Sequence, residues 1–158
     1  MEAKYINPFI NGATNALETM AGLELERKTP YLKQENQTQG DISGIIGFAG
    51  ENVHGAVAMS FPQPLALKIY KQMMGESVFR ITQDVEDCIG ELANIVAGGA
   101  KTEFAEMGLS FHISIPTVVV GQGHTLVQKI DSPVMVIPFG VGKSRFLMEV
   151  TMKLGQNV

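Results

Sequence analysis

The sequence predicts an α+β fold: one domain with a mostly antiparallel sheet, built from two related units that each hold a helix and three strands. Two observations support this prediction. Apolar residues recur at helical spacing in three segments, and short apolar runs rich in β-branched residues, separated by glycines, fill most of the remainder. Runs of hairpin strands beside a few helices are typical of α+β domains. A length of 158 residues fits a single domain over residues 1–158.

The first half of the chain is predicted to form a helix and a hairpin. Residues 6–20 have helical spacing, and Gly22 follows where a helix would stop. Residues 33–40 have the composition of a loop. Residues 42–49 and 53–61 are short apolar runs separated by a Gly-Glu-Asn triplet, which predicts a β-hairpin.

The second half is predicted to form two helices and three strands. Residues 65–74 have helical spacing and end before Gly75, where a C-cap glycine would sit. Residues 84–107 form a longer helix whose apolar side chains keep to one face, and Gly108 closes it. The predicted strands are residues 109–120, 134–139 and 146–152.

A short internal repeat relates the two halves. Met-Ala-Gly-Leu at 20–23 is followed after six residues by Pro30, and Met-Gly-Leu at 107–109 is followed after six residues by Pro116. We interpret this as a duplication with pseudo-repeats at about 4–61 and 84–152, linked by the short helix at about 64–74. The alternative is a chance match, because the shared string is short.

The charge and the cysteine usage exclude several classes of function. The formal net charge is −4, so no basic field is available to bind nucleic acid. A single cysteine excludes an intramolecular disulfide framework and fits a reducing compartment. The start of the chain lacks a secretory pattern, and no apolar run approaches the roughly 18 residues of a membrane helix. We therefore expect a cytoplasmic protein with no membrane partner.

Several local motifs do not support a catalytic or metal-binding function. The Gly-Val-Gly-Lys-Ser run at 140–144 lacks the first glycine of a P-loop and lies between two predicted strands, so a hairpin turn is the better interpretation. Cys88 falls on the apolar face of the long helix, where a free cysteine behaves as a small buried hydrophobe. The three histidines have no ligand spacing, so we expect no metal site; they are His54, His112 and His124.

The long helix has a second, ordered face opposite its apolar one. At about 100° per residue, a set of polar and small residues falls within about 40° of the direction opposite the core. An ordinary solvated face is the alternative interpretation, and periodicity alone favours it. The residues are Asp87, Glu91, Asn94, Gly98, Lys101 and Ala105.

This face carries a resemblance to a known family. Asp-x-x-x-Glu-x-x-Asn at 87–94, followed after 21 residues by Pro116, resembles the signature of the CheC, CheX and FliY chemotaxis phosphatases. Residues 90–101 and 115–121 are most similar to the CheX branch, and the likeness extends to Ile-Asn-Pro-Phe at 6–9. Glu-x-x-Asn alone would be weak evidence for the family. The helix, the spacing and the proline together are more specific.

The resemblance implies a phosphatase that removes the phosphoryl group from the aspartate of a CheY-like response regulator. It also implies a duplicated architecture with the long helix as the active-site helix, a homodimer joined through its sheets, and no cofactor bound by this chain, because the Mg²⁺ belongs to the regulator. When the two units are aligned so that Met20 matches Met107, Lys4 matches Glu91 and Asn7 matches Asn94. The first copy lacks the acid, so one site per chain is expected.

The resemblance assigns Asn94 to positioning the attacking water and Glu91 to pairing with the regulator's active-site lysine. Asp87, Gly98 and Lys101 are the expected partner-binding residues. A structural role near the helix N-terminus is the alternative for Asp87. Gly98 would keep the surface low for close docking.

Two other functions stay open from the sequence. The same face could dock a response regulator or a flagellar switch component without catalysis. An unrelated α+β ligand-binding domain would require the signature to be accidental.

Overall fold

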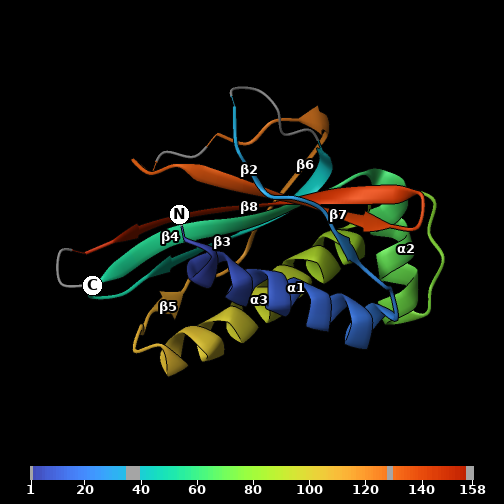
Figure 1. The fold of residues 1–158 in the computed structure, drawn as a ribbon. Helices are drawn as coiled ribbons and strands as arrows, with labels where there is room; N and C mark the ends of the chain where they lie inside the picture. Colours follow the sequence, from blue (N-terminus) through green and yellow to red (C-terminus); the bar gives the residue numbers. More distant parts are fainter. Residues whose placement is uncertain (1, 35–39, 128–129, 156–158) are drawn as a thin grey trace.

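Within the described residues 2–34, 40–127 and 130–155 of the computed structural model, three helices cover one face of an eight-stranded antiparallel sheet (Figure 1). The predicted α+β class is confirmed. The helices are α1 (Ala3–Ala21), α2 (Gln63–Met74) and α3 (Gln83–Glu106). The strands are β1 (Glu26–Arg27), β2 (Tyr31–Leu32), β3 (Gly40–Ala49), β4 (Val53–Phe61), β5 (His112–Ile113), β6 (Thr117–His124), β7 (Val134–Val141) and β8 (Ser144–Leu154).

Glycines end the first two helices as the sequence predicted. Gly22 and Gly75 adopt left-handed φ values of 62° and 76° and donate their amides back to the last turn of α1 and α2. Glycine reaches this conformation without the Cβ penalty of other residues. α3 ends at Glu106 with Met107 as its cap residue, and Gly108 after the cap has a φ of 82°. These caps fix where each helix turns back toward the sheet.

The strand order is symmetric about the pair β4 and β8. The sheet runs β1-β7-β8-β4-β3-β5, with β2 also pairing β7 and β6 also pairing β3. Each central hairpin is therefore flanked by the short strands that follow the helix of the other half. A duplicated helix-plus-three-strand unit would give this order if the first strand of each unit were broken in two; the duplication itself stays a prediction.

The strand predicted at residues 109–120 is wrong in its bounds. The structure divides this segment into β5 and β6, with Ser114, Ile115 and Pro116 between them. Proline cannot donate a ladder hydrogen bond, so it lies directly before the edge strand β6. Between α1 and β3, the short strands β1 and β2 both pair with β7.

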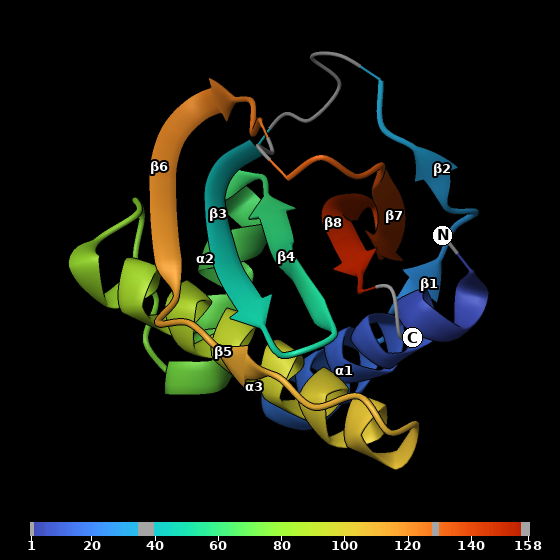
Figure 2. The same cartoon turned by 90° about the vertical axis from the view of Figure 1, so that its left-hand side faces the viewer.

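The hydrophobic core lies between the helices and the sheet. α1 and α3 lie side by side and run in opposite directions, and α2 covers the end of the sheet (Figures 1 and 2). A chain of aromatic contacts joins both helices to the sheet, with ring centroids 5.4–5.5 Å apart from Phe9 to Phe48 and Phe104. Cys88 lies in this core, as predicted.

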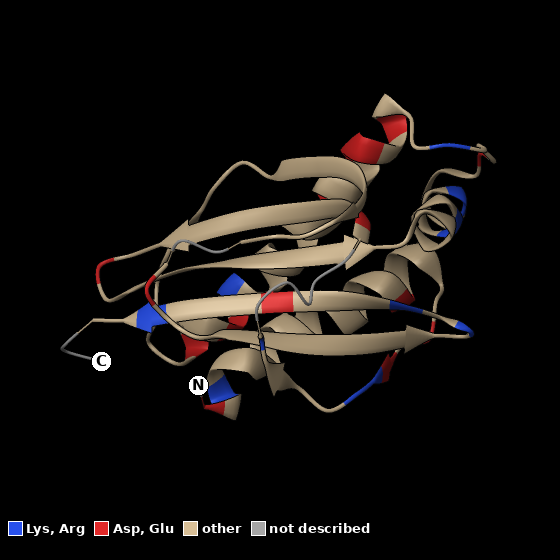
Figure 3. Cartoon of the chain, turned by 90° about the horizontal axis from the view of Figure 1, so that it is seen from above, with Lys and Arg blue, Asp and Glu red and all other residues tan. Residues whose placement is uncertain are grey.

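The opposite face of the sheet is also buried near its centre, where it carries polar side chains. Figure 3, which looks onto this side, shows charged residues mostly on helices and strand ends. Glu149 on β8 is an exception: it is fully buried and forms a 2.9 Å ion pair with Lys33. Nearby, the Ser43 hydroxyl lies 2.7 Å from the Ser60 hydroxyl and 2.6 Å from Nε2 of His124.

The Gly-rich run at 140–144 forms the turn between β7 and β8, as predicted, with Gly142 at a φ of 59°. Among the described residues, none of the helices combines the length and the hydropathy that crossing a membrane requires.

Candidate active site on helix α3

Helix α3 begins at a defined cap beside a set of acids. The hydroxyl of Thr82 accepts a 3.3 Å hydrogen bond from the amide of Val85, which satisfies one of the unpaired amides of the first turn. Asp84 and Glu86 lie in that turn, where negative charge interacts favourably with the helix dipole. The cap and the acids fix the start of the helix, and hence the rotation of every later side chain about its axis.

The predicted site residues lie along α3 and reach the surface to different degrees. Glu91 and Asp87 are exposed, and Asn94, Gly98 and Lys101 are half-buried. The Asp87 carboxylate accepts a 2.9 Å hydrogen bond from the side chain of Gln83, one turn earlier on the same helix. Asp87 thus has a local structural contact, and its role in partner binding stays a prediction.

Glu91 and Asn94 are placed to act on one bound group. Three residues on an α-helix are separated by about 4.5 Å along the axis and by about 60° around it. Within residues 2–34, 40–127 and 130–155, neither side chain has a hydrogen-bond or ion-pair partner. A carboxylate and a carboxamide therefore remain available to an incoming molecule.

Strand β6 and its leading proline pack against the helix next to this pair. A Cβ added at Gly90 would lie 3.3 Å from Cγ2 of Val118 and 3.7 Å from Cγ of Pro116. On the sheet side, a Cβ at Gly44 would lie 3.1 Å from the Cβ of Ala93. One flank of the helix, beside its polar face, is thus held closely against strands β6 and β3. The sequence contained Pro116 as a motif residue but gave no signal of this contact.

The two adjacent glycines of α3 have different surroundings. A Cβ at Gly98 would meet nothing within 4 Å, whereas a Cβ at Gly99 would lie 3.7 Å from the Cα of Gly12 on α1. Gly99 therefore belongs to the contact between the helices, and Gly98 leaves an open position on the polar face.

Cys88 is not placed to act as a nucleophile. Its thiol is buried and lies 3.7 Å from the sulfur of Met73. Burial raises the pKa of Cys88 above the value of 9.0 for an exposed thiol, and the nearby Glu91 carboxylate raises this pKa further. Both effects disfavour the reactive thiolate.

The described part of the chain contains no group of three or more His, Cys, Asp or Glu residues close enough to hold a metal ion. In the sheet, Ala49 on β3 is paired with His54 on β4 and with His112 on β5.

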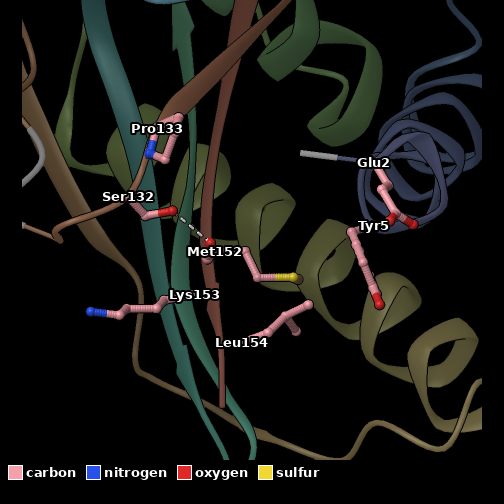
Figure 4. Close-up of a pocket in the computed structure, with 7 residues that line it drawn as sticks. All are labelled: Glu2, Tyr5, Ser132, Pro133, Met152, Lys153 and Leu154. Atoms are coloured by element: carbon pink, nitrogen blue, oxygen red, sulfur yellow. Dashed lines mark hydrogen bonds between the residues drawn. The ribbon is translucent and has the colours of Figure 1, made fainter. Parts of the chain in front are cut away.

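A surface pocket of about 340 Å³ lies away from α3, between the start of α1 and the end of β8 (Figure 4). Its lining is mostly apolar and none of it comes from α3. The Ser132 hydroxyl there donates a 2.7 Å hydrogen bond to the carbonyl of Met152. Nothing in this pocket arranges a base beside a nucleophile.

Comparison with known proteins assigns this fold to a class of chemotaxis proteins. Residues 42–140 match the family model described as chemotaxis phosphatase CheX. The chain therefore belongs to the CheX family of chemotaxis phosphatases. Among curated protein sequences, none matches the chain.

Solved structures agree with this assignment. A CheC-like superfamily protein from Shewanella sp. PV-4 is 37% identical, with a TM-score of 0.92 over 97% of this chain and 99% of that one. Chemotaxis protein CheX from Vibrio vulnificus is 36% identical, with a TM-score of 0.91 over 96% of this chain and 100% of that one. A complex of CheX with CheY, BeF₃ and Mg²⁺ from Borrelia burgdorferi is 24% identical, with a TM-score of 0.79 over 94% and 97%, and shows a shared fold.

Proposed function

We propose that this protein hydrolyses the aspartyl phosphate of a CheY-like response regulator, with Glu91 and Asn94 as its catalytic residues. The observation that carries the proposal is the pairing of an exposed carboxylate with a half-buried carboxamide, three residues apart, on an accessible face of α3. Family membership supports the reaction class, and the complex of a relative with CheY supports the class of partner.

Hydrolysis of an aspartyl phosphate depends more on the position of the attacking water than on a strong base. An aspartyl phosphate is an activated acyl phosphate, and its hydrolysis forms a bond from a water oxygen to phosphorus while the bond from phosphorus to the carboxylate oxygen breaks. The proton of the water leaves with inorganic phosphate. A catalyst that holds this water in line contributes mainly through orientation.

Asn94 has the groups for this task. A carboxamide offers one acceptor and two donor hydrogens, so it can hold a water while donating to a phosphoryl oxygen. This role is comparable with that of the water-orienting glutamine of GTPases. Asn94 is half-buried, which limits the rotamers of its side chain and favours a fixed orientation.

Glu91 has a complementary role. Its exposed carboxylate would pair with the lysine of the regulator's active site, which fixes the docking geometry around the phosphoryl group. The Mg²⁺ required for the reaction is bound by the regulator, and this chain supplies no cofactor. Asp87, Gly98 and Lys101 extend the docking face on either side of the catalytic pair.

The test is the decay of phosphate from a purified, phosphorylated CheY-like protein with and without this chain. We expect faster decay with the wild type, and a loss of that acceleration on the order of 100-fold for Asn94→Ala and Glu91→Ala. Asn15→Ala and Glu106→Ala are matched controls, because these exposed residues lie on α1 and at the end of α3, away from the pair. Circular dichroism checks that each variant folds.

The same assay separates catalysis from docking alone. A non-catalytic binding module would bind the regulator but leave its phosphate lifetime unchanged, and Asn94→Ala would then have no effect on that lifetime. Absence of acceleration across several regulators would contradict the phosphatase proposal.

We also propose a homodimer joined through the sheets, located in the cytoplasm with its regulator. The edge strand β6 pairs only with β3 among the described strands. An unpaired strand edge can add a strand from a second copy. Sedimentation at micromolar concentration tests the dimer, and a monomer would contradict it; cell fractionation tests the location.

A further inference from the structure

Ile115 is a large apolar residue that the fold leaves in solvent beside the candidate active site. Its exposed fraction is 87%. It directly precedes Pro116, whose ring packs at Gly90, the residue before Glu91. An isolated exposed isoleucine is common on protein surfaces, so exposure alone does not indicate a binding role. The position of Ile115 and its fixed backbone do indicate one.

The backbone on both sides of Ile115 is held in place. The amide of Ser114 donates to the carbonyl of Gly47 at 2.8 Å, and the amide of Gly47 donates back to the Ser114 hydroxyl at 2.9 Å. That hydroxyl also lies 3.1 Å from the carbonyl oxygen of Ile115, to which it donates. On the other side, Pro116 contacts α3, and Thr117 is paired with Ile45 in the sheet. The backbone at Ile115 is therefore held in place before any partner arrives.

We propose that Ile115 is an apolar anchor that binds the CheY-like regulator and sets its affinity, while Glu91 and Asn94 act on the phosphate. This inference rests on the proposed function. A rigid anchor contributes to affinity because little conformational freedom is lost on binding. Well-packed apolar groups inside a polar rim account for most of the binding energy in many interfaces.

The position of Ile115 makes the regulator the expected occupant. A stable interface covers roughly 800 Å² on each partner, which is a patch with a radius of about 16 Å. Pro116 contacts α3 at Gly90, which is about 6 Å along the axis from Asn94. A regulator centred on the catalytic pair therefore extends over Ile115.

The test compares Ile115→Ala and Ile115→Asp with the wild type in the phosphate-decay assay, at varied regulator concentration. We expect KM to rise about tenfold for Ile115→Ala and more for Ile115→Asp, with kcat unchanged within twofold. The Kd for the regulator loaded with Mg²⁺ and BeF₃⁻, which takes the place of the phosphoryl group, should rise by the same factors.

Leu32→Asp is the matched control. Leu32 is an isomer of isoleucine with an exposed fraction of 57%, on β2 at the other edge of the sheet (Figure 2). It should leave KM, kcat and Kd unchanged. If Leu32→Asp weakens binding as much as Ile115→Asp, the loss of affinity comes from added surface charge in general. That result would contradict the proposal that Ile115 is an anchor.

Four further outcomes would overturn the inference. With an active wild type, an unchanged KM and Kd in Ile115→Asp would remove the anchor and leave the proposed function standing. A fall in kcat without a change in KM would place Ile115 in the catalytic step instead. A change in oligomeric state would assign Ile115 to contact with a second copy of this chain. If the wild type neither binds nor dephosphorylates any regulator, both the function and the anchor fail.

Discussion

Gly12 on α1 lies against the carbonyl oxygen of Val96 on α3. A Cβ added at Gly12 would come within 2.6 Å of that oxygen, closer than real Cβ contacts allow. The two helices therefore approach each other at a point that only glycine permits. Val96 is two residues after Asn94, so this contact helps to fix the height and rotation of the polar face of α3.

Gly12→Ala should destabilise the protein. The added methyl group must push α1 away from α3, which costs about 1–3 kcal/mol in a well-packed core. Urea unfolding followed by circular dichroism measures the loss. Gly99→Ala is the control, because its Cβ would make only an ordinary contact of 3.7 Å with the Cα of Gly12. Equal stability of the two variants would contradict the claim that the approach of α1 to α3 at Gly12 requires glycine.

Gly98→Leu should weaken regulator binding without destabilising the fold. The open space around a Cβ at Gly98 accepts a side chain, and removing a mid-helix glycine gains up to about 1 kcal/mol of helix propensity. The same side chain would rise from the polar face and obstruct docking. Gly98→Ala serves as the small-volume control. Unaltered affinity in Gly98→Leu would show that the glycine is not kept for docking.

Replacing Lys33 with methionine should destabilise the protein, by up to about 5 kcal/mol, because it removes the cation that lies 2.9 Å from the buried Glu149 carboxylate. Chemical denaturation measures this cost. Replacing both residues with apolar ones, in Lys33→Met with Glu149→Leu, should cost less than Lys33→Met alone, since the buried carboxylate is then removed together with its cation. A single substitution as mild as the double one would contradict the importance of the ion pair.

Cys88 should make stability depend on alkaline pH. Its pKa is raised in the folded state, first by burial and then by Glu91, so the folded protein retains the thiol proton above pH 9, where the unfolded chain releases it. The contribution is fully present below that pH and is lost as pH rises through the folded pKa. Between pH 9 and 10.5 the wild type should lose more stability than Cys88→Ala, measured by urea unfolding. Parallel pH profiles would contradict the raised pKa.

The sequence predicted most elements because their signals are local. Gly22 and Gly75 mark helix ends through their own backbone freedom, and the hairpin of β3 and β4 follows from two apolar runs around a glycine turn. The division into β5 and β6 was missed, because apolar composition continues through Ser114 and Ile115 and only pairing with β3 shows where each strand stops.

The candidate site shows the same division between local and long-range information. Helical periodicity places Asp87, Glu91, Asn94, Gly98 and Lys101 on one face, and a three-residue spacing sets the geometry of the proposed catalytic pair, Glu91 and Asn94. Periodicity placed Gly98 on this face and Gly99 off it, but only the structure shows that Gly99 lies against Gly12 of α1, more than eighty residues earlier.

The sequence by itself determined the fold class, the long helix and the residues of its polar face, because these depend on spacing along the chain. Only the tertiary structure decided which strands flank α3, that Pro116 packs at Gly90, and that Ile115 stands rigid and exposed beside the pair. Those contacts join residues far apart in sequence. Their geometry is set by sheet register and by the close approach of backbones, which leave no pattern in the composition of any one segment.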